Sequence, residues 1–505
     1  MSNEQKSLFL IIGSAIEKLV ETGELPEISL PPDEGLSIPF ADGARDGIAV
    51  YHMGVFELTD ETRELMERAV DTASDGEFEE AERLFTELGR QAGALSVIDE
   101  LQSYIIANSG TLSVNSLCDF AVYAMTNSTD RECVKFGLSI IELINIEDND
   151  KLKSVVSMLG HCDEFTLFSL FVMSRWSDGN ANIAYLATQT HGWGRIHAIE
   201  RLRPDTEEIR QWLLREGVHN TVLPAYSALT CWDKSGAEEL LETGEKLSDE
   251  DFHGIRDIID ALLDEGPCAG ISGVSSPVKR MREFLAQAAD RDNLDLDDYM
   301  VIRNIRGYDE TSCLPGMCDD ILNTEQCREC ISRAVKEGKA IEFANELGID
   351  CKPDVLELLA ADVEKNAHLC VHMLEDEEYR EKAIAVFREK LPLDEMKAAP
   401  TTELGLGKAF SRENALDFIV QYLGSFPFEG TELIDTALQC APPRNRNFAL
   451  RALQDWVNEK QTPLETLLPE MFALVCELKD NEPDDKVREK MEKLIRGEID
   501  ETDDA

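Results

Sequence analysis

The chain has 505 residues, of which 100 are acidic and 49 basic, so its formal net charge is −51. Because no basic field is present to attract phosphate groups, we expect no nucleic-acid partner and no binding to a membrane surface. The excess acid is typical either of a well-solvated surface or of an acidic mimic or immunity-type protein that neutralises a basic target.

The first predicted element is an amphipathic helix over residues 4–22, which ends at Gly23. Its apolar run, residues 7–16, is shorter than the ~20 residues that a membrane span needs, and it lacks the basic start and cleavage site of a secretory signal. The chain also contains 13 cysteines. Without a secretory signal, these cysteines indicate a reduced, cytoplasmic protein whose thiols are mostly small core side chains.

Residues 24–56 differ from the rest of the chain because prolines interrupt any continuous helix. Prolines 26, 31, 32 and 39 predict an extended strand or loop that carries apolar residues such as Leu36 and Ile38. The pairs Asp42-Gly43 and Asp46-Gly47 add turn signals. We expect residues 1–58 to form a helix and a Pro-rich extended cap over the first repeat, although a small hairpin or a recognition segment fits the same pattern.

Helical patterns dominate from residue 59 onward. Thr59 and Asp60 are suited to cap a helix that runs to about residue 72, and later helices follow with the spacing of hairpins of about 35–45 residues. A breaker-rich stretch over residues 264–320, with one helix expected near 277–290, predicts a hinge or irregular insertion. It separates two series of helical repeats, 59–263 and 321–497, and residues 498–505 form an acidic tail.

One helical skeleton, Arg-x-x-Ala-[Ile/Leu]-x-x-[Leu/Phe], occurs three times, beginning at Arg195, Arg380 and Arg446. Its positions i, i+3, i+4 and i+7 share one face of a helix. The alanine permits close approach of a neighbouring helix, and the arginine at the head of the apolar stripe needs a polar partner. Residues 129–141 contain a degenerate fourth copy, in which Val134 replaces the arginine.

The stretch Gly192-Trp-Gly-Arg-Ile-His-Ala-Ile-Glu-Arg-Leu202 resembles the second helix of a HEAT-type repeat. This resemblance implies an all-α fold, namely an α-solenoid of HEAT-like helical hairpins with a short irregular N-terminal segment. It also implies that each stripe arginine pairs with acids or carbonyl groups of adjoining turns. More loosely, the stretch resembles a group of bacterial helical proteins labelled limonene hydroxylase. That label implies a terpene oxygenase, but no flavin, haem or non-haem iron signature accompanies it.

Three residues in this stretch are candidates for a partner surface: Trp193, His197 and Arg201. His197 and Arg201 lie one helical turn apart and off the apolar stripe, and Trp193 offers a large anchor. The alternative is that Trp193 closes the turn and packs between repeats, because tryptophan is highly buried on average.

Two groups of residues have the chemistry of metal ligands but also an ordinary structural explanation. The first group consists of Cys313, Cys318, Cys327 and Cys330, and the second of Glu364, His368 and His372. Four thiolates suit tetrahedral zinc, but the last two cysteines fall inside a predicted helix, where a three-residue step is helical periodicity. The two histidines lie on one helix face without a His-Glu-x-x-His pattern or a third ligand. We therefore expect no cofactor, and we leave a metal at either group open.

The sequence contains no P-loop, no Gly-x-Ser-x-Gly elbow and no Rossmann fingerprint. It therefore favours a non-enzymatic helical-repeat scaffold or adaptor that binds a protein partner through a concave face. The negative net charge favours a basic protein as that partner. Two alternatives stay open. One is the small-molecule enzyme implied by the limonene hydroxylase resemblance, and the other is the acidic mimic or immunity-type protein.

Overall fold

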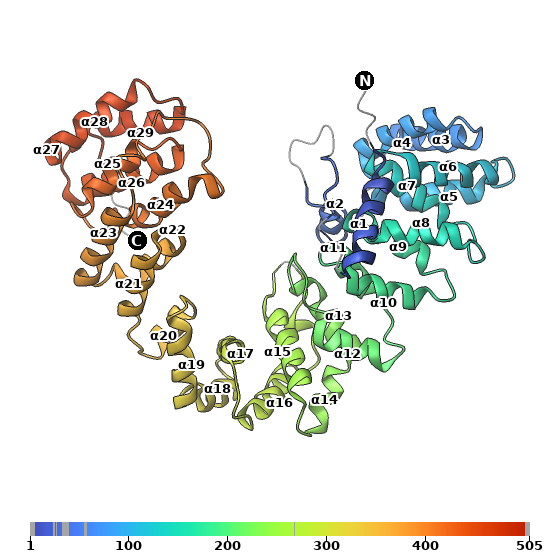
Figure 1. Ribbon diagram of the computed structural model, residues 1–505, viewed down its shortest axis with the longest axis horizontal. Helices are drawn as coiled ribbons and strands as arrows, with labels where there is room; N and C mark the ends of the chain where they lie inside the picture. Colours follow the sequence, from blue (N-terminus) through green and yellow to red (C-terminus); the bar gives the residue numbers. More distant parts are fainter. Residues whose placement is uncertain are drawn as a thin grey trace. The chain divides into compact units, whose positions relative to one another are not determined.

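The computed structural model contains helices and no strands in the residues that it describes, which are 6–23, 26, 28–32, 40–54, 58–266 and 268–499 (Figure 1). The all-α class expected from the sequence is therefore confirmed. The chain divides into two compact units, Met1–Asp319 and Asp320–Ala505. Within the described ranges, every helix is too short or too polar to cross a lipid bilayer. Leu36, Ile38, Pro39 and residues 500–505 of the acidic tail lie outside those ranges.

The N-terminal region contributes α1 (Leu8–Thr22), α2 (Ala44–Ile48) and a π-helical turn, Ala49–Met53, that continues α2. α1 packs against α6 (Val114–Asn127) and α8 (Asp150–Gly160). Gly43 precedes α2 with a φ of 75°, so the turn predicted at Asp42-Gly43 is present. In contrast, residues 44–53 are helical rather than extended, and Asp46-Gly47 lies inside the helix rather than in a turn.

Local capping signals set many of the helix boundaries in the first unit. Its remaining helices before residue 264 are α3 (Asp60–Ser74), α4 (Phe78–Ala92), α5 (Ala94–Ala107), α7 (Arg131–Ile141), α9 (Asp163–Met173), α10 (Gly179–Gln189), α11 (Trp193–Arg201), α12 (Glu207–Glu216), α13 (Ala225–Ser235), α14 (Ala237–Thr243) and α15 (Asp249–Leu263). The Thr59 hydroxyl accepts the Thr62 N–H at 3.2 Å, so the predicted cap of α3 is confirmed. The Asp130 carboxylate likewise accepts the Cys133 N–H at 2.8 Å and caps α7.

Alternate helices of the first unit pack against one another in series. α7 contacts α9, α9 contacts α11, α11 contacts α13, and α13 contacts α15. The interior between them is apolar, and Val134, Phe136, Phe165 and Ile196 are all fully buried. The series α7, α9, α11 and α13 therefore forms a continuous packed framework, on which the side chains described in the next section are positioned.

The stretch predicted as a hinge or insertion, residues 264–320, contains more helix than the single one expected. After a 3-10 turn at Ile271–Gly273 come α16 (Pro277–Ala289), α17 (Leu296–Arg306) and α18 (Leu314–Leu322). α16 begins at a proline, which is suited to the first position of a helix. α16 packs against α14, and α17 packs against α15, so these two helices belong to the first unit.

The second unit packs around its C-terminal helices. It contains α19 (Glu325–Val335), α20 (Ile341–Glu346), α21 (Lys352–Ala361), α22 (Val363–Asn366), α23 (Glu377–Lys390), α24 (Ser411–Leu423), α25 (Thr431–Leu438), α26 (Pro443–Lys460), α27 (Leu464–Leu467), α28 (Pro469–Lys479) and α29 (Asp485–Ile495), with 3-10 turns at Ala367–Met373 and Lys408–Phe410. α26 contacts α24, α25 and α29. Its Trp456 is fully buried and donates an indole N–H to the Leu423 carbonyl at 2.7 Å.

The three arginines of the repeated skeleton are buried and bonded to neighbouring turns. Arg195 donates to the Glu216 carbonyl at 2.5 Å. Arg380 donates to the Leu374 carbonyl at 2.7 Å and forms a bidentate pair with Glu429. Arg446 donates to the carbonyls of Cys440 and Ala441 and pairs with both carboxylate oxygens of Glu482. The predicted pairing of the stripe arginines with acids or carbonyl groups is therefore confirmed.

Candidate functional site

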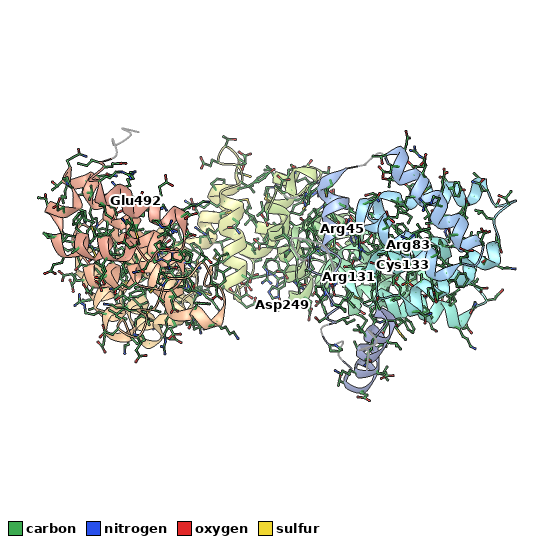
Figure 2. All side chains as sticks on the ribbon, turned by 90° about the horizontal axis from the view of Figure 1, so that it is seen from above. Arg45, Arg83, Arg131, Cys133, Asp249 and Glu492 are labelled. Carbon is green, nitrogen blue, oxygen red and sulfur yellow. The ribbon has the colours of Figure 1, made fainter. Side chains whose placement is uncertain are left out.

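Residues 40–54, which we call the docked segment, lie against helices that are far away in the sequence. Polar contacts connect this segment with α4, α7, α9, α11 and α13 of the first unit. Arg45 of the segment and Arg131 of α7 are both labelled in Figure 2. The docked segment therefore crosses the same series of helices that forms the framework of the unit.

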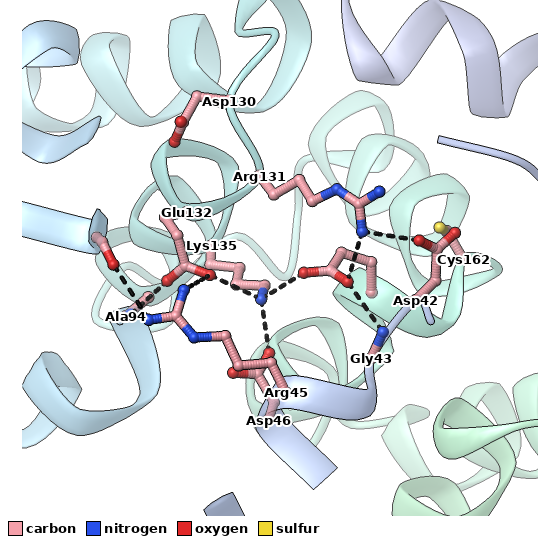
Figure 3. Close-up of polar contacts among 12 residues, drawn as sticks. Asp42, Gly43, Arg45, Asp46, Ala94, Asp130, Arg131, Glu132, Lys135 and Cys162 are labelled. Atoms are coloured by element: carbon pink, nitrogen blue, oxygen red, sulfur yellow. Dashed lines mark hydrogen bonds and ion pairs between the residues drawn. The ribbon is translucent and has the colours of Figure 1, made fainter. Parts of the chain in front are cut away.

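The centre of the site is Lys135, whose side chain is fully buried in the middle of α7 (Figure 3). Its ammonium group forms ion pairs with Asp46 of the docked segment at 2.7 Å, with Glu132 at 3.0 Å and with Glu164 at 2.5 Å. Glu132 also accepts the Ala94 N–H at 2.5 Å. One buried cation therefore joins the docked segment to the starts of α5, α7 and α9.

A second cation of α7, Arg131, lies one helical turn before Lys135 and holds the start of the docked segment. Its guanidinium group donates to Asp42 at 2.7 Å, to Glu164 at 3.1 Å and to the Pro31 carbonyl at 2.8 Å. Asp42 and Asp46 are four residues apart, as are Arg131 and Lys135. The two carboxylates of the segment therefore match the two cations of α7 in order and spacing.

Burial and charge act in opposite directions on the titration of this cluster. Burial raises the pKa of Asp46 to about 6, although Lys135 acts to lower it. For Glu164, burial is outweighed by Lys135 and Arg131, which hold the pKa of this carboxyl below its ordinary value. Burial would lower the pKa of Lys135, but the surrounding carboxylates raise it well above its ordinary value. Lys135 therefore stays charged, while the pKa of Asp46 lies above the ordinary range of an aspartate.

Two glycines allow the docked segment to approach the helices closely. A Cβ atom on Gly43 would lie 2.6 Å from the Asp163 carbonyl oxygen, and one on Gly47 would lie 2.2 Å from the Trp193 ring. Gly43 also has a φ of +75°, which side-chain-bearing residues rarely adopt. Each of the two aspartates is therefore followed by a glycine for a steric reason, and the pattern Asp-Gly-x-x-Asp-Gly describes what the helices accept.

Aromatic side chains hold the other end of the docked segment. The Tyr51 hydroxyl donates to Glu200 at 2.5 Å, and burial together with that carboxylate raises the pKa of Tyr51. Its ring centroid lies 4.7 Å from that of Tyr226 and 5.9 Å from that of Trp193. His52 forms a 2.7 Å hydrogen bond with the Tyr226 hydroxyl. The segment therefore ends against α11 and α13.

The three residues considered for a partner surface are largely covered. Trp193 is only 5% exposed and packs between the docked segment and Tyr226, which agrees with the alternative of a packing role. His197 is 1% exposed, and neither of its ring nitrogens has a hydrogen-bond partner among the described residues. The Arg201 side chain keeps 26% of its surface exposed and stacks over Phe171. The docked segment and the helix packing therefore enclose Trp193 and His197 in this conformation, whereas Arg201 stays partly exposed.

A cavity of about 890 Å³ lies beside the start of the docked segment. It is bounded by Phe40 and Asp42 of the segment, by Asp163 at the start of α9 and by Val222 in the α12–α13 connection. Asp163 accepts the Gly194 N–H at 3.1 Å, and burial raises the pKa of this carboxyl to about 6. Val222 is 37% exposed, so this edge of the site is open to solvent.

The cysteines and histidines considered as metal ligands differ in burial and in backbone conformation. Cys318 and Cys327 are buried, and burial raises the pKa of each thiol to about 12, so both remain protonated. Cys313 is exposed, and Cys330 is half-buried. The expectation of one helix face for His368 and His372 is wrong, because these residues lie in a 3-10 helix, where positions four apart point in different directions.

Sequence reasoning also missed one cluster with the chemistry of metal ligands. Donor atoms of His253, Asp295 and Asp298 lie within 4.8 Å of one another. The Arg256 guanidinium lies 3.1 Å from Asp298 and 3.3 Å from Asp295, so it already supplies the positive charge that these carboxylates require. This cluster therefore has a structural explanation as the partner of a buried arginine.

Comparisons with models of protein families, with curated proteins and with solved structures found no match for this chain. The site is therefore interpreted from its own geometry. It consists of a peptide segment held on a series of helices by paired charges, close-fitting glycines and an aromatic cluster.

Proposed function

We propose that the protein is a non-enzymatic helical-repeat scaffold that binds a protein partner, and that α7, α9, α11 and α13 carry its binding face. One observation carries this proposal: a 15-residue segment of the chain already lies across these helices and contacts each of them through a side chain or an N–H group. A face that holds one segment with a specific sequence has the chemistry to hold another.

A HEAT-like α-solenoid is the architecture we infer for this scaffold. Stacked hairpins bring residues one repeat apart into contact, so side-chain contacts recur at a regular separation along the chain. Such contacts occur at separations of 36 to 49 residues, for Arg446–Glu482, Arg63–Glu100, Tyr123–Glu82, Arg291–Asp249 and Arg380–Glu429. The series of contacts between alternate helices supports the same arrangement.

The proposed scaffold works in a reducing compartment, which we take to be the cytoplasm. All 13 cysteines lie in the described residues, and all are free thiols. Eight of the positions are buried, namely Cys133, Cys162, Cys231, Cys318, Cys327, Cys351, Cys370 and Cys440. Their role is therefore packing, which is compatible with an environment that keeps thiols reduced.

The proposal is tested by placing a photo-crosslinking amino acid at position 222, which borders the site and is 37% exposed. The control carries the same amino acid at position 114, where Val114 of α6 is 50% exposed. After irradiation in an extract of the source cells, we expect a protein adduct at position 222 that is absent at position 114. Equal adducts at both positions, or none at position 222, would contradict the proposed binding face.

A further inference from the structure

The docked segment shows which partner chemistry the binding face recognises. Resting on the proposed function, we propose that the face binds a segment of a partner protein in which a tight turn leads into a helix, and which displays two carboxylates four residues apart, each followed by glycine. This partner segment exchanges with residues 40–54. The recognition elements are the two cations of α7, Arg131 and Lys135, and the Trp193 ring, against which only glycine fits.

The cations of α7 specify the carboxylates by spacing as well as by charge. Arg131 and Lys135 are one helical turn apart, and each contacts one carboxylate of the docked segment at 2.7 Å. A single carboxylate would leave one of these contacts unmade, and a pair with another spacing would reach only one cation. Charge-assisted hydrogen bonds of this kind are short and directional, so they discriminate between ligand sequences.

The cluster of charges stays paired when the docked segment leaves. Lys135 keeps Glu132 and Glu164, and Glu164 also keeps Arg131 at 3.1 Å. Glu132 keeps the Ala94 N–H. Release of the segment therefore strands no cation of α7, so the face is a preformed receptor rather than a part of the core that collapses.

Apart from Tyr51, whose ring packs against Trp193 and Tyr226, the docked segment contributes little apolar surface to its own binding. Its buried residues are Gly43, Asp46 and Gly47, whereas Phe40, Val50 and Met53 are 43%, 44% and 53% exposed. Buried ion pairs contribute specificity but little net free energy, because desolvation offsets the attraction of the charges. The contacts of the segment therefore favour a particular sequence without holding it tightly, which is the condition for exchange.

The net charge of the chain limits the rest of the partner. At −51, the protein repels an acidic protein at long range, although its local cations attract two carboxylates at contact. The paired carboxylates therefore belong to a partner that is neutral or basic elsewhere. This combination distinguishes the proposed ligand from an acidic protein in general.

The test uses the full chain with Asp42→Asn and Asp46→Asn together, which removes the charges of the docked segment and leaves the face unchanged. The matched control, Glu61→Gln with Glu64→Gln, changes the net charge equally at two exposed acids of α3. The probe is a fluorescently labelled peptide with the sequence of residues 40–54, compared with the same peptide carrying asparagine at both aspartates. Binding is measured by fluorescence anisotropy.

We expect the Asp42→Asn/Asp46→Asn chain to bind the aspartate peptide at least ~10-fold more tightly than the wild-type or control chain does. We also expect the asparagine peptide to bind at least ~10-fold more weakly than the aspartate peptide. If the double variant fails to fold, Gly47→Val provides a steric way to release the segment and is tested with the same peptides. Equal affinity for both peptides, or no binding by either released variant, overturns the inference.

Light scattering of the same samples shows whether a second copy of this chain, rather than a partner protein, occupies the binding face. Dimers of the released variant with the wild-type chain, without peptide binding, would mean that the face takes a second copy of this chain, and the inference would be wrong. The proposed function fails independently of this experiment. An adduct at position 222 without peptide binding would leave the scaffold proposal standing and remove only the chemistry assigned to its partner.

Discussion

Replacing Lys135 by methionine tests the physical account of the site. Methionine has a similar length but no charge, so Asp46, Glu132 and Glu164 lose the ammonium group that lies 2.5 to 3.0 Å from their oxygens. Glu164 keeps Arg131, and Glu132 keeps a backbone N–H, whereas Asp46 loses the partner that holds it in the cluster. The substitution therefore leaves buried carboxylates without adequate compensation.

The expected cost follows from this loss of compensation. Removing one member of a buried ion pair lowers the free energy of unfolding by about 3–5 kcal/mol, because the remaining charge stays desolvated. The remaining carboxylates take up protons more readily without Lys135, so their pKa values rise in the folded protein. The folded Lys135→Met variant then binds more protons than the unfolded chain, and its loss of stability shrinks as the pH falls from 7 to about 5.

The assay is urea unfolding followed by tryptophan fluorescence. Four of the five tryptophans, Trp176, Trp193, Trp212 and Trp232, lie in the first unit, so a Trp456→Phe background removes the signal of the second unit. The control is Lys279→Met, because Lys279 is 43% exposed and pairs with Glu242 at the surface, where an ion pair contributes at most about 1 kcal/mol. A Lys135→Met chain that unfolds within about 1 kcal/mol of the parent at pH 7 would refute the reasoning.

Two further substitutions test other parts of the structure. Gly47→Ala places a Cβ atom 2.2 Å from the Trp193 ring, so we expect residues 40–54 to undock more often and their amide hydrogen exchange to accelerate. Unchanged exchange would mean that the Trp193 ring moves to accommodate the methyl group. Arg446→Met should lower the free energy of unfolding of the second unit by about 3–5 kcal/mol, reported by Trp456, since its pair with Glu482 is fully buried. A loss below about 1 kcal/mol would show that this pair is compensated elsewhere.

Helices with strong local signals could be predicted from the sequence, but breaks within them depended on single residues. The cap at Thr59 marks a boundary that the structure keeps. The chain breaks between α27 and α28 at Leu468, because Pro469 cannot continue the hydrogen bonding of the preceding turn. Residues after α22 change to a 3-10 helix at Ala367, a change that no local signal in the sequence marks.

The docked segment shows why tertiary contacts cannot be predicted from local sequence patterns. Asp46-Gly47 is a turn signal by composition, yet it forms part of a helix because α7 supplies a cation for the aspartate and α11 leaves room only for glycine. Both halves of this arrangement were visible in the sequence. The repeated Asp-Gly at a four-residue interval and the Arg131/Lys135 pair at the same interval inside an apolar helix are the signal that could have revealed the site.

The burial of Trp193 and His197 could not be predicted for a related reason. Trp193 and His197 have the residue types of a binding surface, but a residue type does not reveal what covers it. Here Tyr51 of the docked segment packs against Trp193, and Tyr226 packs on both. The segment that covers these residues comes from about 140 residues earlier in the chain, a distance at which helical periodicity carries no information.

The central claim is that the face holding residues 40–54 is also the face that holds a partner. The most direct measurement repeats the cross-linking at position 222 in the presence of excess peptide with the sequence of residues 40–54, beside the peptide with asparagine at both aspartates. We predict that the aspartate peptide suppresses the adduct and that the asparagine peptide leaves it unchanged. An adduct that persists undiminished with the aspartate peptide would contradict the claim, because the partner would then bind elsewhere.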